Sequence, residues 1–239
     1  GNACGCLTAP KTLKKLGVEV KELFCNVNHT FPNHHPDPTV DDNLNSLIKE
    51  IKKGDYDLGI ALDGDADRIV VVDELGNIIR SDNLIALFLP EMITDKNKKV
   101  IYDVKCSEAL EKMIIKYKGQ PLMWNTGHSL IKDKMKKENA NFAGEMSGHI
   151  FFADEYYGYD DALYVGLRLL RLLDKNKKKI SELSNEIPKY YSTPEMRLNC
   201  SNDKEKFKIT EKAIKYFTKN YKCITIDGVR IKFDNGWGL

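Results

Sequence analysis

The chain has 239 residues, of which 42% are hydrophobic and 30% are charged, a balance typical of globular proteins. Its 37 Lys and Arg residues nearly offset its 35 Asp and Glu residues, so we expect neither a nucleic-acid partner nor a membrane partner. No apolar run approaches the roughly 18 residues that a membrane-spanning helix needs.

Short apolar runs alternate with amphipathic helical patterns along most of the chain. In the first third we expect helices over residues 8–16 and 41–53, and strands over 18–24, 58–62, 69–73 and 77–79. The pattern continues with helices over 83–94, 107–118, 129–139 and 160–173, and strands over 99–104, 120–125, 141–144 and 149–152. Strands that alternate with helices predict βαβ units and mostly parallel sheets.

The order of predicted helices and strands changes after Pro188. Here we expect a strand over 194–199, a helix over 204–220, and two strands over 223–226 and 229–233 that form a hairpin at Asp227-Gly228. The predicted fold class is therefore α/β. We expect two consecutive mixed, mostly parallel βαβ sheet domains over 1–77 and 78–188, followed by a partial α+β domain over 189–239. Both ends of the chain fall in loops, so we expect a fragment.

The loop 63–68 carries three aspartates, Asp63, Asp65 and Asp67, between two strongly apolar runs. At about 6 Å separation, each pair of carboxylates repels by a few kcal/mol at a near-surface dielectric. A cation relieves that cost, and carboxylate oxygens favour Mg²⁺ or Ca²⁺. Arg68 adds a planar fork that suits phosphate oxygens.

Three other interpretations of this loop stay open. The spacing of the acidic residues also fits a calcium-binding EF-hand count, with Glu74 at its last position, but Arg68 stands where that loop needs glycine and the flanks are strands. In a second interpretation, the loop is a solvated acidic turn that binds no metal. Arg68 is alternatively an ion-pair partner that only neutralises the aspartates.

Three further segments place polar side chains in strand-to-loop connections. Glu145 and Ser147 lie in a glycine-bracketed connection at 144–149, a way to present hydrogen-bonding groups to sugar hydroxyls. Lys105 and His128 each follow a predicted strand and precede a helix, the edge where open α/β sheets bind ligands.

Together, the segments 63–68, 101–107, 124–129 and 144–149 resemble the α-D-phosphohexomutase superfamily, in particular its bacterial phosphomannomutase/phosphoglucomutase members. The resemblance covers nearly the whole chain and corresponds to the second domain, the third domain and part of the fourth. It implies that Asp63, Asp65 and Asp67 hold Mg²⁺. It also implies catalytic roles for Arg68, Lys105 and His128, and contacts to the substrate from Ser129, Glu145, Ser147 and His149.

The resemblance implies a mutase that interconverts hexose 1-phosphate and hexose 6-phosphate of mannose, glucose or both, through a phosphoserine and a bisphosphorylated sugar. The serine domain and the C-terminal phosphate loop of such a protein are missing here, so we expect no turnover by this chain alone. Alternatives are an aspartyl-phosphate phosphatase that uses Asp63 as nucleophile, and a non-enzymatic metal- or sugar-phosphate-binding module. The six cysteines form no C-x-x-C pair, so we expect reduced thiols and a cytoplasmic location.

Overall fold

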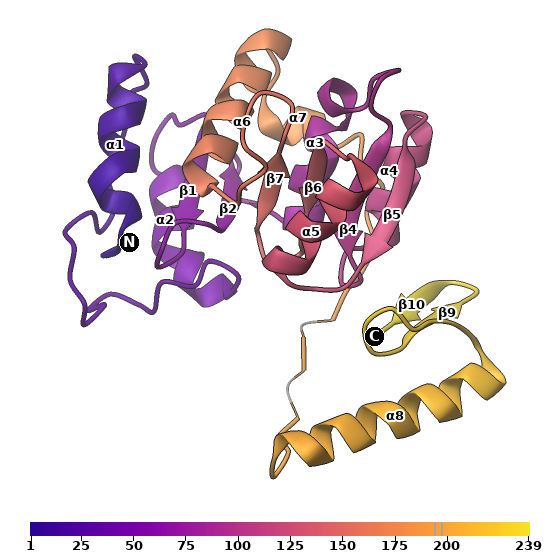
Figure 1. The fold of residues 1–239 in the computed structure, drawn as a ribbon. Helices are drawn as coiled ribbons and strands as arrows, with labels where there is room; N and C mark the ends of the chain where they lie inside the picture. Colours follow the sequence, from indigo (N-terminus) through magenta and orange to yellow (C-terminus); the bar gives the residue numbers. More distant parts are fainter. Residues whose placement is uncertain (194, 197) are drawn as a thin grey trace.

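The computed structural model describes residues 1–193, 195–196 and 198–239. Figure 1 shows two sheet-containing regions side by side, with a third, smaller unit at the C-terminal end. No helix among the described residues is both long enough and apolar enough to cross a membrane.

The first sheet has three strands in the order β1-β2-β3: β1 (Leu58–Leu62), β2 (Ile69–Asp73) and β3 (Ile78–Ile79). The predicted strand positions are confirmed, but the expected parallel pairing is wrong for this sheet. Both pairs are antiparallel, and Leu62 lies opposite Ile69. The physical reason is the length of the connections, because a parallel crossover needs about a dozen residues or more. The loop 63–68 is too short for one.

Two helices and a 3-10 turn accompany this sheet: α1 (Gly5–Lys15), η1 (Asp41–Leu44) and α2 (Asn45–Ile51). The strand predicted over 18–24 is not formed, since none of these residues has strand hydrogen bonding. A cavity of about 490 Å³ separates this segment from β1, and both line it. The segment and β1 thus lie on the wall of the same cavity without strand pairing between them.

The second sheet has four strands in the order β5-β4-β6-β7: β4 (Lys99–Asp103), β5 (Gln120–Trp124), β6 (Phe142–Gly144) and β7 (Ile150–Phe152). The pairs β4·β5 and β4·β6 are parallel, whereas β6·β7 is antiparallel. The prediction of a mixed, mostly parallel sheet is confirmed here. Because β4, β5 and β6 run in the same direction, their carboxyl ends share one edge.

Helices cover both faces of this sheet, as alternation along the strands requires. On one face, Ile101 and Phe151 pack with Ile131 and Met135 of α5 (His128–Glu138). On the other face, a larger buried cluster joins the sheet to α3 (Ser81–Met92) and α4 (Glu108–Lys116). The helices predicted over these segments are present, with ends that differ by one or two residues.

The helix α6 (Ala162–Asn176) contacts α1, β2 and β7, and so bridges the two sheets. Figure 1 shows it in orange between the first and second sheets. Its buried residues Val165 and Leu169 belong to the same hydrophobic cluster as Ile69 of β2 and Phe152 of β7. A short helix that we did not predict, α7 (Ile180–Ser184), follows it.

The ion pair between Arg168 and Asp154 fixes α6 to the segment after β7. The guanidinium is almost fully buried, donates hydrogen bonds of 2.9 and 3.0 Å to the two carboxylate oxygens, and lies 4.3 Å from the Phe152 ring centroid. Burial opposes ionisation of Asp154, but the bonds from Arg168 outweigh it and hold the pKa of Asp154 below its ordinary value.

We expect Asp154→Asn to lower the free energy of unfolding at pH 7 by about 2 kcal/mol, because the buried guanidinium loses a charged partner. A carboxylate with a lowered folded pKa stabilises fully above its unfolded pKa of about 3.9, and that stabilisation is lost as the pH falls through the folded value. The difference in the free energy of unfolding between the variant and the unsubstituted chain should therefore shrink towards pH 2. Urea unfolding at several pH values measures it, and equal stability at pH 7 would contradict the prediction.

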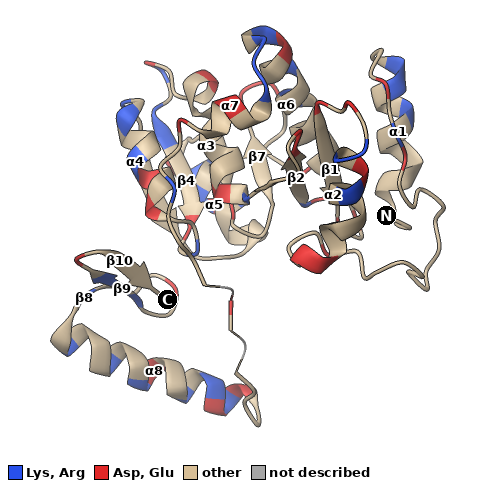
Figure 2. Ribbon diagram, turned by 180° about the vertical axis from the view of Figure 1, so that it is seen from behind, with Lys and Arg blue, Asp and Glu red and all other residues tan. Residues whose placement is uncertain are grey.

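The C-terminal unit consists of α8 (Asp203–Asn220) and a sheet of the order β10-β9-β8: β8 (Lys222–Ile224), β9 (Arg230–Phe233) and β10 (Gly236–Gly238). Charges of both signs run along α8, which buries none of its residues (Figure 2). The predicted hairpin is confirmed, with a longer loop than two residues. The strand predicted over 194–199 includes residues 194 and 197, which lie outside the described residues, and the described part of it is not in strand conformation. Residues 236–238, which we expected to lie in a loop at the end of the chain, instead form the strand β10.

Candidate active site

Polar loops gather where the parallel strands of the second sheet end. Loops begin after Asp103 of β4, Trp124 of β5 and Gly144 of β6, at one edge of the sheet. They carry the predicted site residues, as expected for ligand sites in open α/β sheets. The acidic loop 63–68 reaches the same edge, because the N–H of Ile69 donates a hydrogen bond to the carbonyl of Gly148.

Within the acidic loop, Asp63 organises the backbone. Its side chain is 3% exposed, and its Oδ1 accepts hydrogen bonds of 3.1 Å from the N–H groups of Asp67 and Arg68. Ala66 has φ +65°, a left-handed conformation that a small side chain tolerates at modest cost. These features curl the loop so that its carboxylates converge.

The three carboxylates form a candidate cation site. Oxygen atoms of Asp63, Asp65 and Asp67 all lie within 4.8 Å of one another. Burial raises the pKa of Asp67, and the nearby Asp63 and Asp65 raise it further, although His149 works in the other direction. Three converging hard oxygen donors that repel one another fit Mg²⁺, which takes few protein carboxylates and leaves positions for other oxygen ligands.

Two alternatives for this loop can be compared with the geometry. Arg68 forms the ion pair that we considered: its Nε lies 2.7 Å from Oδ2 of Asp63, and its Nη1 lies 3.5 Å from Asp37. Glu74, the last ligand in an EF-hand count, instead accepts a hydrogen bond from the Ser181 hydroxyl. Strands flank the loop on both sides, so the EF-hand interpretation is wrong.

The loop 145–149 holds Glu145 in a fixed position. This side chain is 1% exposed; its Oε1 accepts a 2.5 Å hydrogen bond from the N–H of Gly127, and its Oε2 lies 3.0 Å from Nδ1 of His149. The hydroxyl of Ser147 lies 3.0 Å from the same nitrogen. Both oxygens of this buried carboxylate thus contact the neighbouring loops.

Gly148 makes the close approach between this loop and the acidic loop possible. Its φ is +106°, and an added Cβ would lie 2.9 Å from the carbonyl oxygen of Ile69. A side chain at this position would thus clash with backbone and also strain the turn. The glycine therefore allows the loop 145–149 to lie directly against Ile69, next to the acidic loop 63–68.

His149 connects the two loops through its side chain. Its Nε2 lies 3.4 Å from Asp67 Oδ1, while its Nδ1 faces Glu145. Burial lowers the pKa of His149, but the hydrogen bond with Glu145 and the charge of Asp67 outweigh burial and raise it above its ordinary value. The resemblance implies that His149 contacts the substrate, and the structure places its side chain between two carboxylates.

His128 begins α5 and stacks on His149, with ring centroids 5.5 Å apart. Its Nδ1 lies 2.7 Å from Asp160, whose other oxygen accepts a 2.8 Å hydrogen bond from Lys132. Burial opposes ionisation of Asp160, but the bonds from Lys132 and His128 hold its pKa below the ordinary value. An imidazole held by a carboxylate has a defined tautomer and is suited to move a proton at Nε2.

Sequence reasoning missed Asp160, which we counted only as part of a helix start. The available signal was the pair Asp160-Asp161 before a helix. Only Asp161 caps α6, through a hydrogen bond from the N–H of Tyr164. A helix start needs one cap, so the second aspartate was free for another use.

Sequence reasoning also missed Asp103, the fully buried last residue of β4. It accepts hydrogen bonds from the N–H of Met146 at 3.1 Å and from the hydroxyl of Thr126 at 3.3 Å. Burial raises its pKa above the ordinary value. Asp103 thus joins the loops after β5 and β6, and the only sequence signal was an aspartate at the end of a buried strand.

The remaining predicted residues lie nearer the surface. Lys105 follows β4, and its Nζ lies 2.8 Å from a carboxylate oxygen of Glu195. Ser129 is exposed on the first turn of α5. Both lie at the sheet edge described above.

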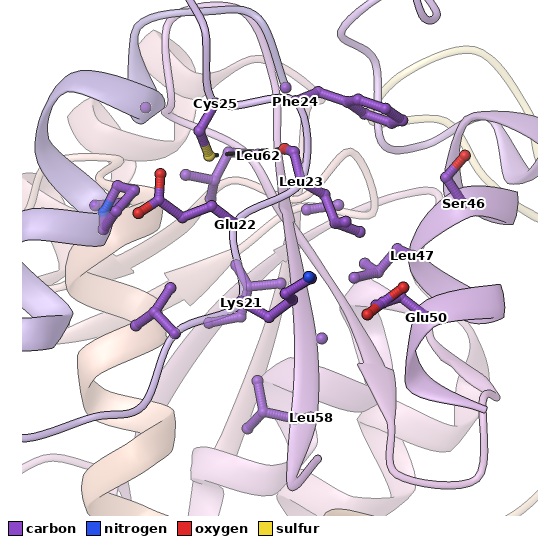
Figure 3. A pocket seen from close by; sticks show the side chains of 18 of the residues that line it. Lys21, Glu22, Leu23, Phe24, Cys25, Ser46, Leu47, Glu50, Leu58 and Leu62 are labelled. Carbon is purple, nitrogen blue, oxygen red and sulfur yellow. Dashed lines mark hydrogen bonds between the residues drawn. The ribbon is translucent and has the colours of Figure 1, made fainter. Parts of the chain in front are cut away.

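The large cavity beside β1 is a different place (Figure 3). Its lining is largely apolar around Leu23, Leu47 and Leu58, and Figure 3 shows Leu62 beside them. Of the predicted site residues, Asp63 is the one among its described lining residues. The polar loops, not this cavity, therefore form the candidate active site.

Comparison with known proteins agrees with this arrangement. The model of phosphoglucomutase/phosphomannomutase alpha/beta/alpha domain II matches residues 1–76, and the model of alpha/beta/alpha domain III matches residues 80–191. The phosphomannomutase/phosphoglucomutase of Pseudomonas putida is 43% identical over 242 residues, which cover 100% of this chain and 52% of that protein. The phosphoglucomutase of Neisseria meningitidis serogroup A is 45% identical with the same coverage.

A solved structure shows the same likeness in three dimensions. The chain superimposes on a phosphoglucomutase/phosphomannomutase family protein from Burkholderia thailandensis with a TM-score of 0.90 and 41% identity, over 100% of this chain and 51% of that one. The chain thus spans about half the length of the relatives that it matches. The matched segments, the sheet topology and the paired acidic and glycine-bracketed loops lead to one conclusion: the chain belongs to the phosphoglucomutase/phosphomannomutase family.

Proposed function

We propose that the chain is part of a Mg²⁺-dependent phosphosugar mutase that interconverts hexose 1-phosphate and hexose 6-phosphate, with mannose, glucose or both as the sugar. The observation that carries the proposal is the junction at His149, which lies between Asp67 of the acidic loop and Glu145 of the polar loop. The acidic loop 63–68 can hold a cation that binds a phosphate, and the neighbouring loop 145–149 carries hydrogen-bonding groups. Together they suit a substrate that has both a phosphate and hydroxyl groups.

In this proposal, Asp63, Asp65 and Asp67 hold Mg²⁺, which offsets negative charge on the phosphoryl group while it is transferred. Glu145 and Ser147 hydrogen-bond sugar hydroxyls, and Ser129 and His149 assist in substrate binding. Arg68 and Lys105 add positive charge beside the phosphate oxygens. His128, oriented by Asp160, accepts or donates the proton of the reacting hydroxyl.

The proposed mutase needs parts that are not in this chain. By the family resemblance of its sequence, these parts would be a phosphoserine in a preceding domain and a phosphate-binding loop in a following segment, and the relatives are about twice as long as this chain. We propose that residues 1–77 and 78–188 are its metal-loop and sugar-loop domains, and that 189–239 begin its last domain. A cytoplasmic location agrees with the proposed reaction and with thiols that are all unpaired.

An aspartyl-phosphate phosphatase is a weaker candidate. Its nucleophile would be Asp63, but that side chain is nearly buried, and both of its oxygens accept hydrogen bonds from Asp67 and Arg68. A carboxylate so engaged is a poor nucleophile. Labelling of Asp63 by beryllofluoride would support the phosphatase over the mutase.

Calorimetry of the 239-residue chain tests the proposed function directly. We expect glucose 1-phosphate to bind at least about tenfold more tightly with Mg²⁺ than without it, a difference of about 1.4 kcal/mol, because cation and phosphate share the site. A coupled assay should detect no conversion to glucose 6-phosphate by this chain. Binding of Mg²⁺ with no effect on sugar-phosphate affinity would favour a simple metal-binding module instead.

A further inference from the structure

The hairpin of the C-terminal unit contacts the candidate active site through Arg230. This residue begins β9 and is 1% exposed. Its Nη1 donates hydrogen bonds to two backbone carbonyl oxygens, that of Val104 at 2.5 Å and that of Cys106 at 2.7 Å. Its guanidinium carbon lies 3.7 Å from the ring centroid of Trp237 in β10. One side chain thus joins the C-terminal sheet to the loop after β4.

The environment of this guanidinium is unusual for a buried cation. Its side-chain hydrogen bonds go to backbone carbonyls, and its Nε has no hydrogen-bond partner among the described residues. The carboxylates of Glu108 and Glu111 contribute Coulombic attraction to it. Desolvation lowers the pKa of Arg230. A buried charge whose hydrogen bonds go to carbonyls and whose plane lies on an aromatic ring is costly for stability.

The two carbonyls flank Lys105 on both sides in the chain. They belong to the peptide groups 104–105 and 106–107, so one guanidinium holds both ends of the Lys105-Cys106 stretch and restricts the backbone between them. The loop has further bonds in the same place: the N–H of Cys106 donates to Asp103, and the N–H of Ser107 donates to Asp82. Arg230 therefore sets the direction in which the Lys105 side chain leaves the sheet edge.

The same hairpin also contacts the loop that leads to His128. The side-chain amide of Asn125 donates a 2.7 Å hydrogen bond to the carbonyl of Ile226, and the N–H of Thr126 donates a 3.0 Å hydrogen bond to Asp227. Two neighbouring loops that carry predicted catalytic side chains are thus held by one hairpin.

We propose that Arg230 is a positioning residue: it holds the backbone on both sides of Lys105 and so couples the C-terminal unit to the active site. Its part in sugar-phosphate binding rests on the proposed function. The structural coupling of the hairpin to the Lys105 loop does not, so the two are tested separately.

Amide hydrogen exchange on the 239-residue chain tests the coupling. With Arg230→Met we expect exchange at Cys106 and Ser107 to rise by about tenfold or more, since local opening of this loop loses a restraint. Exchange in the sheet cores, at Ile101 and Val71, should stay unchanged. Arg230→Lys keeps the charge but lacks the planar fork. Its exchange rates at Cys106 and Ser107 should therefore lie between those of the unsubstituted chain and those of Arg230→Met. Arg171→Met, an exposed arginine of α6, is the matched control.

Affinity for glucose 1-phosphate with Mg²⁺ present is the second measurement. We expect it to fall by about tenfold in Arg230→Met and less in Arg230→Lys, with Mg²⁺ affinity unchanged. Unchanged exchange at Cys106 and Ser107 would overturn the proposal. So would a uniform rise in exchange across the chain, which means general destabilisation, or a local rise with unchanged sugar-phosphate affinity. If the unsubstituted chain binds no sugar phosphate, the proposed function fails, and exchange alone still decides whether Arg230 restrains the loop.

Discussion

Replacing Asp65 with asparagine is expected to weaken Mg²⁺ binding by about a hundredfold, which corresponds to about 3 kcal/mol. The change removes one of three negative charges that converge within 4.8 Å while it preserves side-chain volume. Asp65 is exposed and takes part in no hydrogen bond with the described residues, so the fold should be unaffected. Titration calorimetry of the chain with Mg²⁺ measures the loss, and thermal unfolding checks the fold.

Asp57→Asn is the matched control for this prediction. Asp57 is an exposed aspartate just before β1, outside the converging carboxylates. We expect this variant to bind Mg²⁺ like the unsubstituted chain. If Asp65→Asn and Asp57→Asn bound Mg²⁺ equally well, the acidic loop would not be the cation site. The proposed function would then lose its main chemical support.

The three aspartates are not equivalent, although the sequence presents them alike. Asp63 is buried and binds the backbone of its own loop, whereas Asp65 is exposed, and Asp67 faces His149. Substitution of Asp63 therefore disturbs loop shape and metal binding together. For this reason Asp65 gives the cleaner measurement.

Most helices and strands were predictable because their apolar spacing is set locally. Helix α6 and the strands β1 and β2 are strongly patterned, and the structure places them where the pattern does. The pattern over 18–24 predicted a strand that does not form. A strand needs a pairing partner, and this segment lines the cavity beside β1 without pairing with it. The antiparallel first sheet follows from the short loop 63–68, which we underestimated.

The candidate site was predictable only in its local parts. The loops at 63–68 and 144–149 are contiguous motifs, so the residues that they carry were readily named. Contacts between distant segments were not: Asp160 reaches His128 from another loop, and Arg230 reaches the Lys105 loop from the C-terminal unit. No local pattern specifies such pairs, since the sheet topology and the docking of the hairpin create them.

In a mutase of the length of its relatives, Asp160→Asn should lower kcat by about a hundredfold with a much smaller change in KM. The carboxylate holds Nδ1 of His128 at 2.7 Å, and an amide nitrogen in its place would favour the wrong tautomer. Proton transfer by an oriented imidazole contributes about 10²–10⁴ in rate. Steady-state kinetics with glucose 1-phosphate and saturating Mg²⁺ measure the effect.

A double-mutant cycle separates orientation of His128 from a general electrostatic effect. If Asp160 acts through the imidazole, His128→Gln and Asp160→Asn should each cost about as much as the pair together, because the second change removes nothing further. Asp133→Asn, an exposed aspartate on α5 that pairs with Lys137, should leave kcat unchanged. Strictly additive losses would show that Asp160 and His128 act independently. His128 would then lose its assignment as the residue that moves the proton with the help of Asp160.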